Sequence, residues 1–179
     1  METNLFGALA VTRGCIPHFR AQKSGTIVNI SSTSGISGNA GYSLYAASKF
    51  ALEGASESLA AELAPFNIRV LIVEPGGMRT NFQAAVDANE VSEPYKGTPA
   101  DQIAQRMSGV HGKQAGDPEK AARAIVEAVT GVGRGKDVER QLRLPLGKDA
   151  VQRAHTKIKG FGENVEKVRH ISEWVVFDE

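Results

Sequence analysis

Two short runs of β-branched and apolar residues, separated by a long helical stretch, constrain the fold of this chain most strongly. The first run covers 26–31 and the second covers 68–73, and both are typical of buried strands. Between them, residues 43–64 carry an apolar stripe at helical spacing, and Pro65 ends the helix. A strand, a helix and a strand in this order predict a parallel α/β sheet.

The segments around this unit predict further helices. Residues 4–20 have apolar positions near helical spacing, and Pro17 is expected to end or kink that helix. Asp117-Pro118-Glu119 is a clear helix start, and the helix is expected to run to Thr130, because Gly131 follows. A last helical region is predicted over 149–176, with a break near Gly160 and Gly162.

Three other segments are expected to be less regular. Residues 32–41 are rich in Ser and Gly and predict a loop, and 138–144 predict a weak third strand. Residues 78–98 show little periodicity, and a loop of this length in a compact domain is usually functional or mobile. Trp174 is expected to anchor the end of the chain to the body.

The composition is typical of one folded domain with balanced charge and no disulfide bonds within the chain. The 179 residues are 41% apolar and 23% charged, as in soluble globular proteins. The net charge of +1 argues against nucleic-acid or anionic-membrane partners, and no apolar run reaches a membrane span. The single cysteine, Cys15, fits a reducing compartment, here the cytoplasm. The four histidines lack metal-ligand spacing, so no metal site is predicted.

Tyr45, Lys49 and Ser32 can together form a proton-transfer site for a carbonyl or an alcohol. Residues four apart lie on one face of a helix, so Lys49 lies one turn beyond Tyr45. A nearby cation lowers the pKa of a phenol toward the range useful for general acid–base catalysis. Ser32 follows the first predicted strand and could donate to the same substrate oxygen as Tyr45. An exposed Tyr–Lys pair on a solvated helix is the alternative when the motif stands alone.

Four motifs, taken in their order along the chain, resemble those of a known family. They are Asn4-Leu5-Phe6-Gly7, the run from Gly25 to Ser32, the run from Tyr42 to Lys49, and Pro75-Gly76. In order and spacing they resemble the second half of a short-chain dehydrogenase/reductase. The resemblance is close from Asn4 to about Thr80 and looser afterwards.

The resemblance implies catalytic roles for four residues. Tyr45 would be the general acid or base, and Lys49 would lower its pKa and bind the nicotinamide ribose. Ser32 would orient the substrate carbonyl, and Asn4 would hold a water that links Lys49 to solvent. The implied reaction is reversible hydride transfer between NAD(P)H and a carbonyl carbon.

The resemblance also implies cofactor contacts. Tyr45 and Lys49 would contact the nicotinamide end together with Pro75, Gly76 and the backbone near Met78, and Thr80 would reach toward the diphosphate. The cofactor is NADP or NAD, with NADPH preferred on family frequency. The substrate would be a small, hydrophobic alcohol or ketone, held by the loop and the C-terminal helices through Phe82, Val86, Tyr95 and Met107.

The predicted domain is a single but incomplete one. Residues 1–179 would form a partial Rossmann-like, doubly wound parallel sheet of about three strands with flanking helices. Residues 1–80 would be the catalytic core, and 81–179 the substrate loop and C-terminal helices. The Gly-rich turn that normally approaches the diphosphate is expected upstream of Met1. A fragment or misassigned start is the favoured explanation, and a genuinely shortened product is the other.

The alternative function is a truncated, non-catalytic remnant. It would keep the two long predicted helices, 4–20 and 43–64, which in the family pack against a second subunit. Through them it would associate with full-length family members, and the enzyme itself would form a homo-oligomer in the same way.

Overall fold

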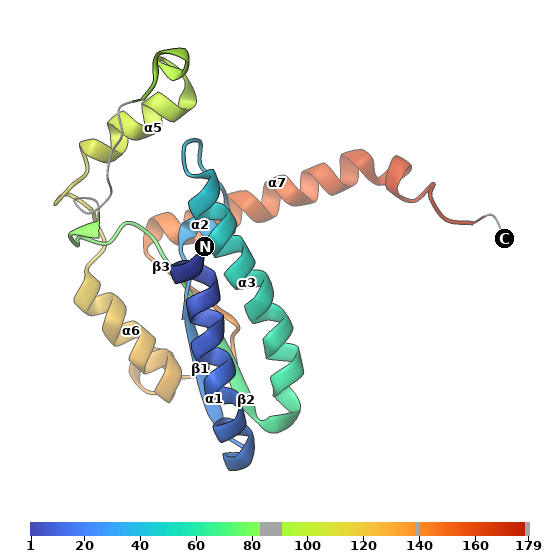
Figure 1. The fold of residues 1–179 in the computed structure, drawn as a ribbon. Coiled ribbons are helices and arrows are strands. Elements are labelled where there is room, and N and C mark those ends of the chain that lie inside the picture. Colours follow the sequence, from blue (N-terminus) through green and yellow to red (C-terminus); the bar gives the residue numbers. More distant parts are fainter. Residues whose placement is uncertain (83–90, 139, 178–179) are drawn as a thin grey trace.

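A three-stranded parallel sheet forms the centre of the protein (Figure 1). The computed structural model describes residues 1–82, 91–138 and 140–177. The strands are β1 (Gly25–Ile30), β2 (Ile68–Pro75) and β3 (Arg143–Leu146), in the order β1-β2-β3. Gly25 pairs with Ile68 and Ile30 with Val73, so β1 and β2 end at the same edge of the sheet.

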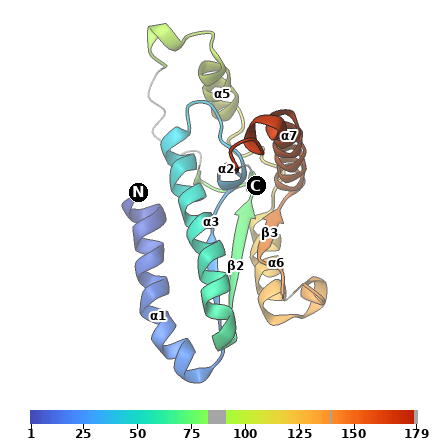
Figure 2. The ribbon, with the colours of Figure 1, turned by 90° about the vertical axis from the view of Figure 1, so that its right-hand side faces the viewer.

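Helices cover both faces of this sheet, as in a doubly wound fold (Figure 2). The two long helices α1 (Ala8–Gln22) and α3 (Ser43–Leu63) lie on one face, and α6 (Pro118–Thr130) lies on the other. Each face has its own apolar cluster, because neighbouring strand residues point to opposite sides. The first cluster is built on Ile27, Leu63, Ile68 and Val70, and the second on Leu71, Val73 and Ala128.

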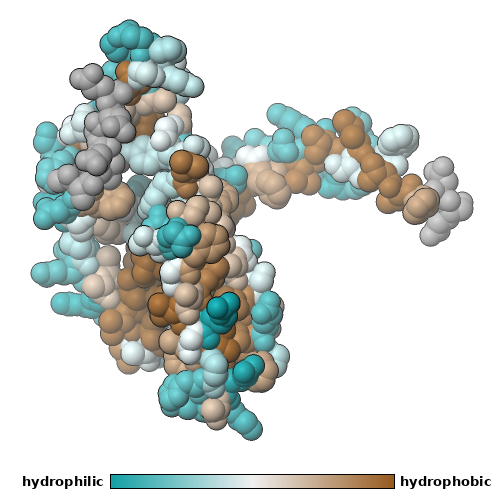
Figure 3. Space-filling model, in the orientation of Figure 1, coloured by the Kyte–Doolittle hydropathy of each residue, from teal (hydrophilic) through white to brown (hydrophobic). Residues whose placement is uncertain are grey.

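The remaining elements are short except for the last one. The short ones are the π-helical turn η1 (Glu2–Gly7), α2 (Thr33–Ile36), η2 (Ala64–Phe66), η3 (Glu93–Tyr95), α5 (Pro99–Ser108) and η4 (Gly133–Gly135). The last helix, α7 (Lys148–Ser172), starts against the body and then projects away from it (Figure 1). Apolar side chains lie along its projecting part (Figure 3). Phe161, in the middle of α7, is 65% exposed.

The predicted central unit is confirmed. The structure contains both predicted strands and the helix between them, which ends at Leu63, one residue before the predicted end. The predicted start of α6 is also confirmed, since the Asp117 carboxylate accepts hydrogen bonds from the backbone N–H groups of Glu119 and Lys120. Gly131 ends that helix in the left-handed conformation, with φ of 70°.

Two expectations in the first half of the chain are met only in part: Pro17 does not end its helix, while a kink there stays a prediction, and 32–41 is not entirely a loop. Helix α1 continues through Pro17 to Gln22, and Lys23, in the left-handed conformation, ends it. Proline removes one backbone donor, and the packing of Ile16 and Phe19 against the sheet keeps the helix intact. The segment 32–41 is not only loop, since Ser32 caps the short helix α2.

Three expectations in the second half also need correction, and one helix was missed. The third strand lies at Arg143–Leu146 rather than at 138–144, and α5 was not predicted. Helix α7 is continuous through Gly160 and Gly162. Trp174 is 82% exposed and does not anchor the chain end to the body. Part of the irregular segment 78–98, including Val86, lies outside the described residues.

Neither a bilayer-crossing helix nor a metal-binding cluster occurs in the described parts of the chain. None of the helices there is both long and apolar enough to cross a membrane. The same residues contain no group of three or more His, Cys, Asp and Glu side chains arranged to hold a metal ion.

Candidate active site

Helix α3 positions Tyr45 and Lys49 one turn apart, at the edge of the sheet where β1 ends. The Lys49 ammonium donates a hydrogen bond to the Ile30 carbonyl, with Nζ and O 2.9 Å apart. Its Nζ also lies 5.8 Å from the centroid of the Tyr45 ring. The strand end therefore holds the cation beside the phenol, as the sequence spacing predicts.

Burial changes the acid–base behaviour of Lys49. Loss of hydration lowers the pKa of its ammonium, and the negative charge of Glu53, one turn further along α3, acts in the opposite direction. Because Lys49 is half-buried, its charge is screened less than the charge of a fully solvated lysine. The lysine is thus positioned to favour negative charge on a neighbouring oxygen.

Ser32 follows β1 directly and caps helix α2. Its Oγ accepts a hydrogen bond from the Ser34 backbone N–H at 3.1 Å. A hydroxyl has one donor and two acceptor positions, so this bond leaves the Ser32 O–H proton available to donate. The serine can therefore act as a helix cap and as a hydrogen-bond donor at the same time.

Asn4 contacts α3 between Tyr45 and Lys49. It lies in the π-helical turn η1, a geometry that is often found at functional sites. Its Nδ2 donates to Ser48 Oγ at 3.2 Å, and that hydroxyl donates to the Tyr45 carbonyl at 2.7 Å. Asn4 and Lys49 also line one side cavity of about 450 Å³ that extends along α1 and β1.

Pro75 ends β2, and Gly76 and Gly77 after it are held by β3 and by the start of α7. The Gly76 N–H donates to the Leu146 carbonyl at 2.8 Å, and the Gly77 N–H donates to Asp149 Oδ2 at 2.8 Å. A β-carbon on Gly76 would lie 2.1 Å from Asp149 Oδ1. Glycine is therefore needed at Gly76, and the Gly-Gly pair is tied to α7 rather than loose.

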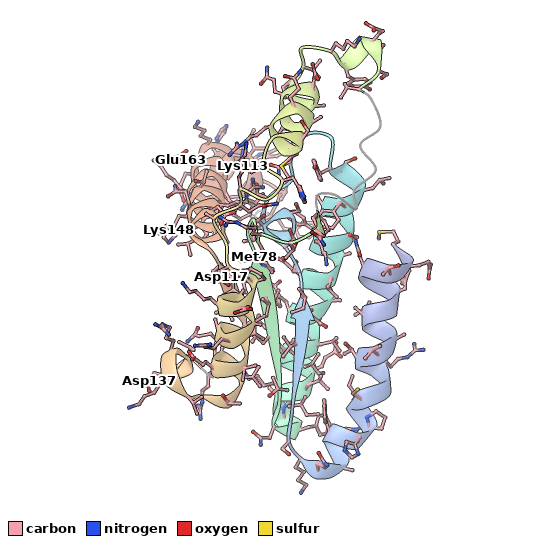
Figure 4. The ribbon with its side chains drawn as sticks, turned by 90° about the vertical axis from the view of Figure 1, so that its left-hand side faces the viewer. Met78, Lys113, Asp117, Asp137, Lys148 and Glu163 are labelled. Carbon is pink, nitrogen blue, oxygen red and sulfur yellow. The ribbon has the colours of Figure 1, made fainter. Side chains whose placement is uncertain are left out.

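Met78 and Thr80 follow this turn and do not line the main cavity. Met78 forms a parallel bridge with Gly116, next to Asp117 at the start of α6 (Figure 4). The Thr80 N–H donates to the Met78 carbonyl at 2.9 Å, and its Oγ1 accepts from the Phe82 N–H at 3.3 Å. Both residues form the backbone of a turn beside the site.

Residues from both halves of the chain line one cavity of about 990 Å³. Of the residues singled out in the sequence, Ser32, Tyr45, Pro75 and Gly76 lie in its wall. Phe82 and Met107 also line it, and the ring centroids of Tyr45 and Phe82 lie 6.3 Å apart. Tyr95, in contrast, is 59% exposed and is not among the lining residues. The α7 side chains Asp149, Arg153 and Phe161 complete the wall, and no local motif marked them in the sequence.

A partly buried charge cluster joins the elements that carry these residues. Arg143 from β3 bonds Glu53 of α3 at 2.6 Å and also pairs with Glu74 of β2. Its other terminal nitrogen bonds Glu57 at 2.6 Å, and Ser31 donates to Glu53. We refer to Arg143, Glu53, Glu57, Glu74 and Ser31 as the Arg143 cluster.

The Arg143 cluster was not found by sequence reasoning, although a signal existed. Glu74 interrupts the apolar run of β2, and its side chain is only 3% exposed. Burial, and then the charge of Glu53, raise the pKa of Glu74, while Arg143 lowers it. A charged residue in a buried strand needs a partner, and this need could have directed attention to Arg143.

Comparison with known proteins identifies the family of this chain. A family model described as short chain dehydrogenase matches residues 1–91. The chain belongs to the short chain dehydrogenase family. The oxidoreductase claN of Passalora fulva is 59% identical over 110 residues, which cover 62% of this chain and 50% of that relative. The chain thus spans about half the length of that relative.

Solved structures of the same family confirm the fold. A short-chain dehydrogenase from Streptomyces avermitilis has a TM-score of 0.83 and 35% identity, covering 98% of this chain and 62% of that chain. A short chain dehydrogenase from Burkholderia cenocepacia, solved in complex with NADP, has a TM-score of 0.64 and 21% identity. That likeness covers 94% of this chain and 56% of the other chain.

Proposed function

We propose that this protein is an oxidoreductase that transfers a hydride reversibly between NAD(P)H and a carbonyl or alcohol substrate. The observation that carries the proposal is the cavity at the carboxyl ends of β1 and β2, where Tyr45 and Ser32 share one wall with Lys49 behind the Tyr45 ring. Open α/β sheets bind their ligands at this edge.

Each of the four proposed catalytic residues would have its own role in the proton transfer. Tyr45 would give a proton to the substrate oxygen during reduction and take it back during oxidation. The Lys49 ammonium would favour negative charge on the phenol oxygen, and Ser32 would donate a second hydrogen bond to the substrate oxygen. Asn4 would hold a water on the other side of Lys49, since both line the side cavity.

The wall of the cavity fits the nicotinamide end of a cofactor. Gln114 lies in this wall, and its buried Oε1 lacks a hydrogen-bond partner among the described residues. A carboxamide N–H is a donor that would satisfy such an oxygen. Pro75, Gly76 and the backbone near Met78 would hold this end, and Thr80 would reach toward the diphosphate. The cofactor, when bound, supplies the hydride.

NADPH is the cofactor that we propose first. The Burkholderia relative of the same fold was solved with NADP, although its identity of 21% supports the fold alone. The substrate that we propose is hydrophobic, because Phe82, Ile103, Met107 and Phe161 line the cavity. We keep the division into a catalytic core, 1–80, and a substrate-binding part, 81–179, as a proposal, since both contribute to this wall.

A homo-oligomer through α1 and α3 is part of the same proposal. Both helices expose apolar side chains, with Val11 of α1 70% exposed and Leu44 of α3 83% exposed. Isolated exposed apolar residues are common, but a pair of long helices lying side by side offers a continuous surface for a second copy (Figure 1). Light scattering of the purified chain, compared with Val11→Glu, tests this arrangement.

The catalytic assignment is tested by replacing one hydroxyl. Tyr45→Phe removes the proposed proton donor and keeps the ring that packs near Phe82. General acid–base catalysis contributes about 10²–10⁴-fold, so NADPH-dependent ketone reduction should fall by at least about 100-fold. Tyr95→Phe is the matched control, because Tyr95 is exposed and is not among the lining residues. Unchanged turnover of Tyr45→Phe would contradict the assignment.

A melting-temperature titration with NADPH and NADH separates binding from turnover. A ligand that binds only the folded state raises the melting temperature in a saturable way. A rise with either dinucleotide supports the cofactor proposal even where the substrate is still unidentified. If neither dinucleotide shifts the melting temperature, this chain alone does not form the proposed holoenzyme.

A further inference from the structure

The part of the main cavity that α5 and α7 form is basic. Among the described lining residues there are three cations, Arg106, Arg153 and Lys157, and one carboxylate, Asp149. The Asp149 carboxylate already accepts the Gly77 N–H, and it packs against Gly76. The described wall of the cavity therefore carries a surplus of positive charge on the side of α7.

Arg153 is the most firmly placed of the three cations. One of its terminal nitrogens donates to the Ser37 carbonyl at 3.3 Å and to Asn39 Oδ1 at 3.1 Å. These contacts join α7 to the segment that follows the Ser32 cap, across more than a hundred residues of sequence. The guanidinium is half-buried, so its position does not depend on a freely moving side chain.

The charge of Arg153 is not neutralised by the described part of the protein. No ion pair joins Arg153 to a carboxylate of the described residues, whereas Arg143 bonds three carboxylates. A guanidinium has five N–H donors, and both bonds of Arg153 to the Ser37–Asn39 segment use the same nitrogen. A partly buried cation without a counter-ion is costly unless a ligand supplies one.

Apolar side chains share the same wall with these cations. Phe82, Ile103, Met107, Val110 and Phe161 line the cavity along with Tyr45 and Arg153. A ligand that fills this cavity would therefore meet the proposed proton donor, an apolar surface and a fixed guanidinium. The complementary molecule is a carbonyl or alcohol with an apolar body and an anionic group.

We propose that Arg153 binds a carboxylate of the substrate, so that the substrate class is apolar keto or hydroxy acids rather than neutral ketones or alcohols. Guanidinium and carboxylate match in shape and can form two parallel hydrogen bonds. The inference rests on the proposed function, because it names the substrate of the same cavity. A phosphate of the cofactor is the other oxyanion that Arg153 could meet, and the test separates the two.

The test compares one keto acid with its methyl ester. The acid 9-oxodecanoate has a ketone near one end and a carboxylate at the other, and the ester has the same body without the charge. Calorimetric titration of the full chain without cofactor should show the acid binding at least about tenfold more tightly, the size expected of one charge-assisted hydrogen bond. The preference should shrink as salt is added.

Variants of Arg153 identify the group that carries the preference. Arg153→Gln should bind the acid and the ester equally, and Arg153→Lys should keep part of the preference because it keeps the charge. Lys120→Gln is the matched control, since Lys120 is 85% exposed on α6 and does not line the cavity. It should behave like the wild type.

Two binding results would overturn the proposal. If the wild type binds ester and acid equally, no anion site exists for the substrate. If Arg153→Gln weakens both ligands by the same factor, Arg153 only positions the Ser37–Asn39 segment. A loss of the NADPH-induced melting shift in Arg153→Gln, with equal binding of acid and ester by the wild type, would instead assign Arg153 to the cofactor.

Turnover distinguishes failure of this inference from failure of the proposed function. Equal NADPH-dependent reduction of acid and ester would leave the reductase in place and refute the substrate class. Reduction of neither compound, together with selective binding of the acid, would keep the anion site and refute the reductase assignment.

Discussion

Replacing Arg143 by methionine should destabilise the protein more than any other single loss of a cation in the described structure. Methionine keeps much of the side-chain length and leaves Glu53 and Glu74 without their partner. Their side chains are only 4% and 3% exposed. Breaking a buried ion pair in this way typically costs about 3–5 kcal/mol.

The lower end of that range applies here. The Arg143 side chain is 37% exposed, and its bond to Glu57 reaches a carboxylate that is 52% exposed. Exposed pairs contribute roughly 0–1 kcal/mol, so the cost comes from the two buried carboxylates. We therefore expect Arg143→Met to lose about 3 kcal/mol of unfolding free energy at pH 7, within a typical total of about 5–15 kcal/mol.

The same variant should recover stability in acid. Burial raises the pKa of Glu74 in the folded protein, and Arg143 opposes this rise. A carboxyl with a raised folded-state pKa stabilises the fold below its unfolded-state pKa, and this contribution is lost as the pH rises through the folded-state pKa. Without Arg143 that pKa rises further, so the loss in Arg143→Met should shrink as the pH falls from 7 toward 5.

Urea unfolding followed by circular dichroism at pH 7 and at pH 5 measures both effects. Arg169→Met is the matched control, because Arg169 pairs with Glu166 and Glu173 on the exposed part of α7. Its expected loss is at most about 1 kcal/mol. A loss below about 1 kcal/mol for Arg143→Met at pH 7, or an equal loss at both pH values, would refute the account of the Arg143 cluster.

Two further predictions concern Lys49 and Gly35. Lys49→Met should abolish the proposed activity and yet raise the melting temperature at neutral pH, because burial lowers the pKa of Lys49 and its charged form destabilises the fold. That advantage should fade toward pH 10, and a lower melting temperature at pH 7 would contradict it. Gly35→Ala should unfold at lower temperature, since its β-carbon would lie 2.0 Å from Glu53 Oε1. The control Gly162→Ala meets nothing within 4 Å and should stabilise α7 slightly.

The sequence predicts the elements whose stability is decided locally. Strands β1 and β2 are short runs of mainly β-branched and apolar residues, and α3 has an apolar stripe with a proline just after its end. Asp117 and Pro118 determine the start of α6, because Asp117 caps the helix and Pro118 fits its first turn. These signals need no knowledge of distant residues. They also put Ser32 directly after the first strand and Tyr45 on the helix that follows, whereas Pro75 and Gly76 were singled out by the family resemblance.

The elements that were mispredicted depend on distant partners. Strand β3 has only four residues, and its position follows from pairing with β2 and from the bonds of Arg143. Helix α7 tolerates Gly160 and Gly162, because each costs about 1 kcal/mol in a helix of 25 residues. The contribution of Arg153 to the cavity arises where α7 meets the Ser37–Asn39 segment, and no local pattern marks such a meeting point.

Tyr45, Lys49 and Glu53 stand on three successive turns of the same uninterrupted helix, so their mutual spacing is as rigid as the helix itself. A shift of α3 as a whole would move all three side chains together. It would change only their distances and orientations relative to Ser32 and to the end of β2. Substitutions among the core residues that contact Leu59 or Leu63, where α3 packs on the sheet, would therefore shift or tilt the whole helix. They would alter the reach of the tyrosine toward its substrate and leave the pairing of tyrosine and lysine intact.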